Sequence, residues 1–185
     1  MRHDHEKDEA AAALSRLVGE ISLNRDFTGL HEAAFLSLAW TWQRLEHVGR
    51  VFFPRYGITG VQFNVLMILD DYRGRAFRQH ELAEILVVNR ASAGSVIDRM
   101  QRAGWIERAA DPQDRRAQLV SLAAAGRAKL KEVKGPYYRL LDSVFGEEDA
   151  KELRAAILFF DRLRVRLASA EARRRHAQSP RHSTP

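Results

Sequence analysis

The sequence predicts a mainly α-helical protein that carries one small β-hairpin. Apolar residues recur at helical spacing along most of the chain, as in the stripe Leu38, Trp42, Leu45, Gly49 and Phe52. Between residues 105 and 122, by contrast, two short stretches flank an Asp-Pro turn, which is typical of strands joined in a hairpin. Two short helices precede this hairpin. The expected fold class is therefore a winged helix-turn-helix flanked by longer N- and C-terminal helices.

The N-terminal part is expected to contain three helices. The first is predicted for residues 10–21. The second is a long helix over residues 31–53, which Pro54 ends because proline cannot donate a backbone hydrogen bond. Thr59 and Gln62 then form a capping-box pattern, so a third helix is expected to begin there and to run to about residue 72.

The middle of the chain is expected to hold two short helices and the hairpin. The helices are predicted for residues 79–86 and 90–103, and the turn between them ends in Asn89, a candidate N-cap. The strands are predicted for residues 105–108 and 117–122. This order of elements is that of a winged helix-turn-helix.

The C-terminal part is expected to be helical again and to end in a disordered tail. A helix begins after Gly126, and the pair Gly135-Pro136 is expected to kink or break it. A last helix begins at about Glu147. Residues 171–185 are rich in arginine, histidine, serine and proline, so this basic segment is expected to be disordered.

The charge of the chain is concentrated at its C-terminal end. The 185 residues carry a formal net charge of +6, and the stretch from Arg162 onward holds seven arginines and one acidic residue. The rest of the chain is therefore neutral overall, so basicity alone does not indicate that the folded part binds nucleic acid.

Several classes of protein are disfavoured by composition. The absence of cysteine excludes disulfides, a thiol nucleophile and Cys-ligated zinc. The apolar runs fall far short of the roughly 20 residues that a bilayer requires, and the polar N-terminus is unlike a secretory signal. A cytoplasmic protein with no membrane partner is expected.

The helix predicted for residues 90–103 has two chemically different faces. The apolar face is expected to pack on the preceding helix, and its residues are Ala93, Val96, Ile97 and Met100. The polar or cationic face consists of Ser92, Ser95, Arg99 and Arg102. A helix that enters the DNA major groove needs short donors near its N-terminus and cations for phosphate further along. An ordinary solvated helix face is the alternative that spacing alone leaves open.

The predicted hairpin tip is rich in charged residues. It carries the run Asp111-Pro112-Gln113-Asp114-Arg115-Arg116. A guanidinium on a thin loop can enter the minor groove, where negative potential is concentrated. Asp114 would be a poor neighbour for phosphate, so we expect it to brace Arg116 or to cap the tip.

These segments resemble one known family of regulators. The run Arg90-Ala-Ser-Ala-Gly-Ser-Val-Ile-Asp-Arg-Met-Gln-Arg-Ala-Gly-Trp-Ile-Glu-Arg108 is similar to the recognition helix and first wing strand of the multiple-antibiotic-resistance regulator (MarR) family. Residues 111–117 resemble the family's wing, and residues 119–126 resemble its second strand and next helix start. Ala123 departs from the pattern, because the family usually has a threonine that caps that helix.

The resemblance implies a domain organisation and a set of DNA contacts. It implies an N-terminal extension (residues 1–30), one MarR-type unit (31–170) and the basic tail. Within the unit, residues 31–56 and 126–170 are expected to form dimerisation helices around the DNA-binding region 59–122. The expected contacts to double-stranded DNA are Arg90, Ala91, Ser92, Ser95, Arg99, Asp114, Arg115 and Arg116.

The resemblance also implies a homodimer and a small-molecule effector. A two-fold dimer reads a pseudo-palindrome with half-sites roughly 10 base pairs apart. The effector expected is a small aromatic or phenolic acid that releases the repressor from DNA, bound by aromatic residues and one cation. The candidate lining is Trp40, Trp42, Arg44, His47, Gln62, Phe63 and Leu66, although aromatic residues on such helices are more often core.

Enzymatic activity, a cofactor and a metal site are not expected. The sequence lacks a Gly-x-Ser-x-Gly motif, a phosphate-binding glycine-rich loop and any metal-ligand spacing. No two of the seven histidines lie four residues apart. The alternatives are a winged helix that binds protein, and a DNA-binding module that responds to no ligand.

Overall fold

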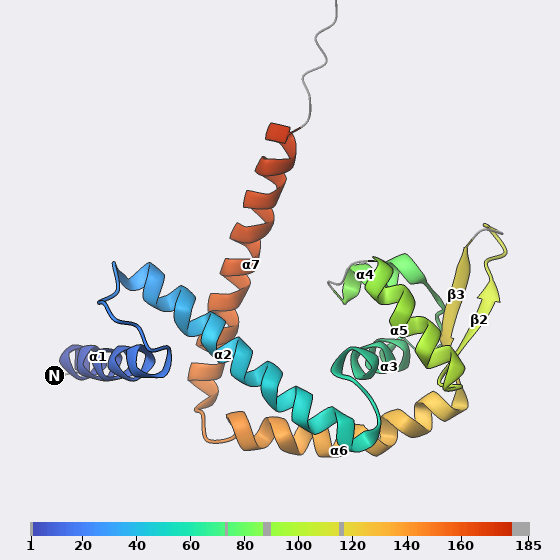
Figure 1. Cartoon of the computed structure of the whole chain (residues 1–185), viewed down its shortest axis with the longest axis horizontal. Helices are drawn as coiled ribbons and strands as arrows, with labels where there is room; N and C mark the ends of the chain where they lie inside the picture. The colour runs from blue at the N-terminus through green and yellow to red at the C-terminus, as the bar shows by residue number, and fades with distance from the viewer. Residues whose placement is uncertain (1, 73, 87–89, 115–116, 179–185) are drawn as a thin grey trace, which may run out of the picture. The chain divides into compact units, whose positions relative to one another are not determined.

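The computed structural model describes residues 2–72, 74–86, 90–114 and 117–178, with the backbone alone for residues 2–6, 90, 91 and 175–178. The chain forms two compact units that divide between Val133 and Lys134, and each is described by itself. The elements, in chain order (Figure 1), are α1 (Arg2–Glu20), α2 (Leu30–Phe52), the 3-10 helix η1 (Phe53–Tyr56), α3 (Gly60–Asp71), β1 (Phe77–Arg78), α4 (Gln79–Ile85), α5 (Arg90–Arg102), β2 (Ile106–Ala110), β3 (Gln118–Leu122), α6 (Ala124–Phe145) and α7 (Ala150–Gln178). The mainly helical fold class with a small wing is confirmed.

Helix α1 begins earlier than predicted. The expected start at residue 10 is wrong, because the helix already includes Arg2. The helix is anchored by Leu17, which is buried, and by Glu20, whose carboxylate accepts a 2.8 Å hydrogen bond from the Trp40 indole of α2. The N-terminal extension therefore contains an ordered helix.

The long second helix and the start of the third follow the sequence closely. Helix α2 ends at Phe52, and Pro54 lies in the first turn of η1, where its missing N–H costs no hydrogen bond. Gly57 then turns the chain with a φ of 64°, in the left-handed region. The capping box is confirmed: Gln62 N–H donates to the Thr59 hydroxyl at 3.2 Å, and Thr59 N–H donates to the Gln62 side chain at 2.9 Å.

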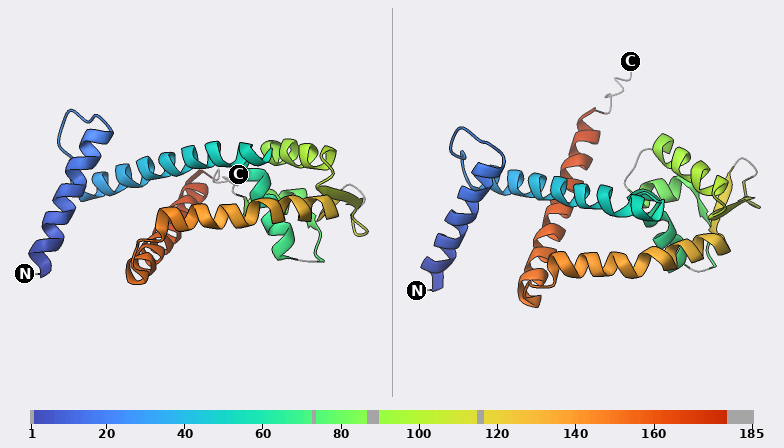
Figure 2. Two further views of the ribbon diagram at one scale, coloured as in Figure 1. Left: turned by 90° about the horizontal axis from the view of Figure 1, so that it is seen from below. Right: turned by 60° about the horizontal axis from the view of Figure 1, so that its bottom comes forward.

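The core of the first unit joins its helices to a small sheet. Figure 2 shows α3, α4 and α5 grouped beside the strands. The largest fully buried side chains come from α3, β1, α4, α5, β3 and α6; they are Phe63, Phe77, Leu66, Leu82, Ile97, Met100, Val65, Val120 and Val133. This shared core fixes the position of α5 relative to the hairpin.

The sheet has three strands, whereas the sequence indicated two. The antiparallel order is β1-β3-β2, with Phe77 opposite Val120 and Ile106 opposite Leu122. The added strand, β1, has only two residues, so it shows no alternating pattern from which it could be predicted. The hairpin strands lie within two residues of their predicted bounds.

The predicted break in the helix after Gly126 is not found. Helix α6 runs without interruption from Ala124 to Phe145 and contains Pro136. A proline removes one backbone donor, which leaves the remaining hydrogen bonds of a 22-residue helix in place. The helix starts directly after Ala123, which offers no side-chain oxygen as a cap, as the departure from the family pattern indicated.

Helix α7 extends further than expected. The predicted disorder from residue 171 is wrong up to Gln178, because the helix continues to that residue. Alanine and arginine, which dominate residues 170–177, both have high helix propensity. The last seven residues of the tail lie outside the described part of the chain. No helix among the described residues is long and apolar enough to cross a membrane.

Candidate nucleic-acid interface

Helix α5 buries the face that its sequence predicted. Ala93, Val96, Ile97 and Met100 are all less than 10% exposed, and the helix packs against α3, α4 and β2. Burial of four apolar side chains on three neighbouring elements leaves the helix little freedom to rotate. The opposite face is therefore presented to solvent in one fixed orientation.

The exposed face of α5 carries polar and cationic side chains. Ser92, Ser95, Arg99 and Arg102 are exposed. Arg102 Nε lies 3.4 Å from the Asp98 carbonyl one turn earlier, so its side chain folds back along the helix. Short hydroxyls in the first turns and cations in the last turn match the needs of a helix in the major groove.

Some of the predicted DNA contacts lie outside the described residues or are described by their backbone alone. The wing arginines Arg115 and Arg116 lie outside the described residues, as does the turn of residues 87–89 with its candidate cap Asn89. For Arg90 and Ala91 the backbone belongs to the first turn of α5. These residues stay predictions.

The wing turn is held by backbone hydrogen bonds around the two arginines. Asp111 N–H donates to the Ala117 carbonyl at 3.1 Å, and Ala117 N–H donates to the Asp114 carbonyl at 2.8 Å. Asp114 N–H lies 3.3 Å from the Asp111 carbonyl. Asp114 thus joins the closure of the turn through its backbone, while its predicted contact with Arg116 lies outside the described residues.

The side chain that organises the turn is Asp111, which is not among the predicted DNA contacts. Its Oδ1 accepts the Gln113 N–H at 2.8 Å, and its Oδ2 accepts the Arg78 Nε–H at 2.7 Å. The pKa of Asp111 is lowered, first by the Gln113 N–H and then by the Arg78 guanidinium, although burial opposes the shift. An aspartate before a proline indicates a turn in which the carboxylate caps the following backbone, so this half of the site was readable from sequence.

A second ion pair connects strand β2 of the hairpin to helix α5. Arg108 of β2 bonds through Nη2 to the Asp98 carboxylate of α5, and its side chain is only 16% exposed. Arg108 Nε is buried, and no described residue accepts a hydrogen bond from it. The pair joins two residues of neighbouring elements that are ten positions apart in the chain.

The residues predicted to line an effector pocket do not converge within the chain. Phe63 and Leu66 are fully buried, and the Phe63 ring packs 5.3 Å from that of Phe53. Gln62 is occupied by the capping box. On α2, a helical turn of 100° per residue puts Trp42 on nearly the opposite side from Trp40.

One face of α2 keeps part of the predicted set together. Trp40, Arg44 and His47 follow one another at spacings of four and three residues, so they share a face of the continuous helix. Arg44 and His47 are exposed. This face offers one cation, one imidazole and one aromatic ring, and it excludes Phe63 and Leu66.

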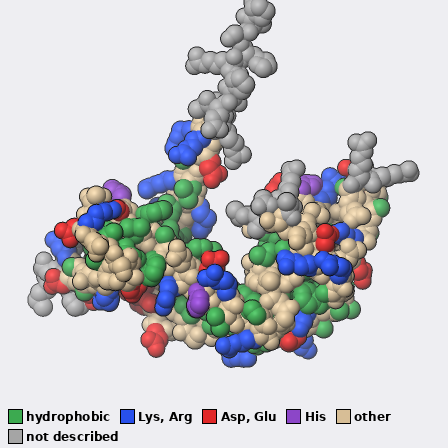
Figure 3. Space-filling view, in the orientation of Figure 1, with side chains coloured by type: hydrophobic (Ala, Val, Ile, Leu, Met, Phe, Trp, Pro, Cys, Tyr) green, Lys and Arg blue, Asp and Glu red, His purple; other side chains and the backbone are tan. Residues whose placement is uncertain are grey.

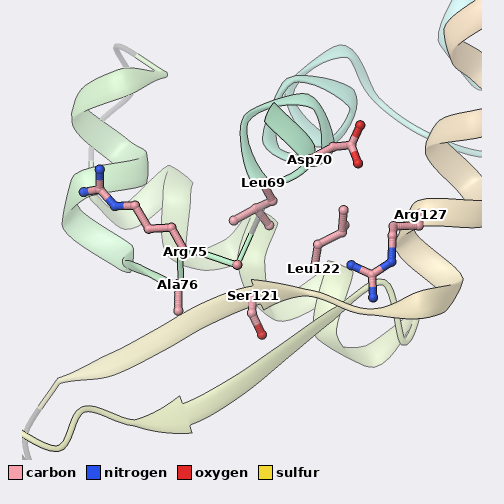
Figure 4. Close-up of a pocket in the computed structure, with 8 residues that line it drawn as sticks. Leu69, Asp70, Arg75, Ala76, Ser121, Leu122 and Arg127 are labelled. Carbon is pink, nitrogen blue, oxygen red and sulfur yellow. The ribbon is translucent and has the colours of Figure 1, made fainter. Parts of the chain in front are cut away.

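A surface pocket of about 430 Å³ lies elsewhere, at the ends of α3 and β3 (Figure 4). Its lining residues are Leu69, Asp70, Gly74, Arg75, Ala76, Ser121, Leu122 and Arg127. Figure 4 shows Arg75 directed away from Arg127. None of the predicted effector residues lines this pocket, and none of its lining residues is aromatic.

Within the described residues, no group of three or more histidine or acidic side chains is arranged to hold a metal ion.

Comparison with known proteins agrees with this geometry. Residues 56–117, from η1 through the wing turn, match the model of the MarR family. The chain is thus similar to MarR-family transcriptional regulators across its helix-turn-helix and hairpin segment. The matched segment contains α3, α4, α5 and β2, and therefore the helix whose exposed face is described above.

Individual relatives extend the likeness beyond that segment. The transcriptional repressor YetL of Bacillus subtilis is 26% identical over 135 residues, which are 71% of this chain and 81% of YetL. A structure of BpsR from Bordetella bronchiseptica, described as regulated in its DNA binding by 6-hydroxynicotinic acid, is 28% identical with a TM-score of 0.62. The alignment covers 72% of this chain and 99% of BpsR.

A protein solved in complex with DNA shares the fold of this chain. A mutant of MarR from E. coli, complexed with operator DNA, has a TM-score of 0.66 at 21% identity, over 75% of this chain and 99% of that one. A likeness at this identity shows the fold alone. The descriptions of these relatives are of regulators rather than enzymes.

Proposed function

We propose that the chain is a homodimeric repressor that binds a pseudo-palindromic operator through α5 and the wing. The observation that carries this proposal is the exposed Ser92, Ser95 and Arg99 on a helix whose other face is fully buried. Serines near the helix N-terminus suit base edges, and Arg99 in the last turns suits a phosphate. The wing arginines Arg115 and Arg116 are proposed to add a minor-groove contact.

Exposed apolar side chains support a dimer. Helix α2 exposes Leu30, Phe35 and Trp42, each by more than 60%. Helix α7 exposes six large apolar residues, namely Ile157, Leu158, Phe159, Phe160, Val165 and Leu167. Hydrophobic side chains are visible on the surface of both helices in Figure 3. Apolar surface on this scale marks an interface, and in a two-fold dimer the same helices pack on their copies.

Arg99→Ala and Arg116→Ala are each expected to weaken binding to DNA from upstream of the protein's own gene. If the lost contact is to phosphate, binding weakens uniformly across sequences and the slope of log Kd against log salt falls by about 1. Electrophoretic mobility shift at several salt concentrations measures both quantities. Arg16→Ala, which removes an exposed arginine from α1, is the matched control and should bind like the wild type.

The outcome that rejects this interface is unchanged affinity and slope in both variants. A wild type that binds no DNA but captures a protein through the same face would favour the protein-binding alternative. A wild type that binds DNA with no response to any small molecule would favour the ligand-independent module.

We also propose that a small aromatic acid releases the repressor. The support is the description of BpsR, whose DNA binding is regulated by 6-hydroxynicotinic acid, together with the α2 face of Trp40, Arg44 and His47. A carboxylate would pair with Arg44 while the ring stacks on Trp40. In thermal-shift measurements with a panel of aromatic acids, at least one acid should stabilise the wild type, and Arg44→Ala should lose the shift. Stabilisation by crude cell extract but by no aromatic acid would contradict the proposed ligand class.

A further inference from the structure

The link between the wing and the helix-turn-helix is an ion pair between residues 33 apart in the chain. Arg78 lies at the junction of β1 and α4, and Asp111 lies just after β2. Both Arg78 Nε and Arg78 Nη2 contact Asp111 Oδ2, at 2.7 Å and 2.6 Å. The Asp111 side chain is 6% exposed and that of Arg78 is 34% exposed. The pair is therefore largely shielded from solvent, where charge pairing is stronger than at an open surface.

The Arg78 end of the pair is fixed by its surroundings. Its backbone pairs with Leu119 in the β1–β3 ladder, and its N–H donates to the Glu81 carboxylate at 2.6 Å. The same residue thus belongs to the sheet and to the start of α4. The Arg78 guanidinium therefore fixes the position of the Asp111 carboxylate relative to both the sheet and α4.

The Asp111 end of the pair controls the turn that carries the wing arginines. Its second carboxylate oxygen accepts the Gln113 N–H, and its own N–H donates to the Ala117 carbonyl on the far side of the turn. Asp111 is thereby hydrogen-bonded to both sides of the loop that follows it. Asp111 is the point at which that loop is attached to the rest of the first unit.

The charge of Asp111 also requires a partner for electrostatic reasons. A carboxylate in a loop that approaches DNA repels the phosphates, and a buried unpaired carboxylate is costly to the fold. Arg78 neutralises Asp111 from the protein side, which leaves the neighbouring wing arginines available for DNA. Coulombic attraction from Asp111 raises the pKa of Arg78 in turn, after the direct hydrogen bond between them.

We propose that Arg78 and Asp111 form a positioning pair that holds the wing turn in the geometry required for operator binding. Neither residue need touch DNA: the pair acts through the wing arginines. This inference rests on the proposed DNA-binding function, and it assigns a role to two residues that lie outside the predicted set of DNA contacts.

The first arm of the test needs no DNA. Trypsin cleaves after Arg115 and Arg116, so its rate reports how firmly the turn is held. Asp111→Asn keeps an oxygen that accepts the Gln113 N–H but removes the negative charge, and Arg78→Met removes the cation. Both variants should be cleaved about tenfold faster at this turn than the wild type, because cleavage follows the open population of a local segment.

The control for this arm is Glu32→Gln. Glu32, at the start of α2, forms an ion pair with Arg25 and also accepts the Thr28 backbone N–H. Like Asp111, it therefore combines an ion pair with an arginine and a hydrogen bond from a nearby backbone N–H. The control should leave cleavage at residues 115 and 116 unchanged. Circular dichroism verifies that each variant is folded. Arg78→Lys keeps the positive charge but offers one nitrogen in place of the two that contact Asp111, so it should give an intermediate cleavage rate.

The second arm measures operator binding in double-mutant cycles. Asp111→Asn should weaken binding about tenfold and make the salt slope shallower by about 1, as for loss of one wing contact. In an Arg116→Ala background the same substitution should have no further effect, because the contact it positions is already absent. In an Arg99→Ala background its effect should persist in full, since Arg99 lies on a separate element.

The two arms separate failure of this inference from failure of the proposed function. Unchanged cleavage in Asp111→Asn and Arg78→Met overturns the positioning pair whether or not the protein binds DNA. Equal effects of Asp111→Asn in the Arg116→Ala and Arg99→Ala backgrounds also overturn it. Faster cleavage in a protein whose wild type binds no DNA would reject the DNA-binding function and, with it, the purpose assigned to the pair.

Discussion

Phe63→Ala is expected to lower the free energy of unfolding by about 3–5 kcal/mol, the largest stability effect predicted for this chain. The Phe63 side chain is 1% exposed, and its ring packs on Phe53 at the junction of η1 and α3. Truncation leaves a cavity among residues that are themselves buried, such as Leu66, so the surroundings can collapse only in part. Denaturant unfolding at one fixed protein concentration measures the change.

The matched control for Phe63→Ala is Ile85→Ala. Ile85 lies at the end of α4 and is 48% exposed, so its truncation should cost less than about 1 kcal/mol. A Phe63→Ala variant as stable as this control would mean that the ring is not part of the core.

Ile157→Asp is expected to split the proposed dimer and, as a consequence, to abolish tight operator binding. Ile157 is 62% exposed on α7, next to Leu158. A carboxylate placed in an apolar interface is desolvated without a partner, so the dimer should dissociate at least about a hundredfold more readily. Each freed subunit then contacts one half-site only, and operator affinity should fall by a similar factor.

Sedimentation and mobility shift on the same samples measure the two effects of Ile157→Asp together. Ile85→Asp is the control, because it adds the same charge at an exposed apolar residue of α4, outside the dimerisation helices. It should remain dimeric. A dimeric Ile157→Asp variant would show that α7 does not form the interface, and the exposed apolar residues of α2 would then be tested in the same way.

The sequence allowed prediction of those features that depend on local periodicity. The two faces of α5 follow from a spacing that any helix imposes, so the burial of Ala93 and Met100 and the exposure of Arg99 were all expected. The capping box at Thr59 was predictable for the same reason, because both partners lie within one turn.

Features that depend on distant partners were not predictable. The Arg78–Asp111 pair joins residues 33 apart, and β1 exists because Phe77 and Arg78 meet β3 about forty residues later. The extent of α7 was underestimated because a basic composition was read as disorder, whereas arginine and alanine favour a helix. The predicted effector lining stays a prediction, but helical phase places Trp42 and Trp40 on different faces of α2.

The proposed function requires that α5 and the wing of a two-fold dimer bind a specific DNA sequence. Hydroxyl-radical footprinting on DNA from upstream of the protein's own gene tests it most directly. We predict two symmetry-related protected half-sites about 10 base pairs apart, and loss of the flanking minor-groove protection in Arg116→Ala. Uniform weak protection along the whole fragment, or a single half-site without a symmetry mate, would contradict the claim.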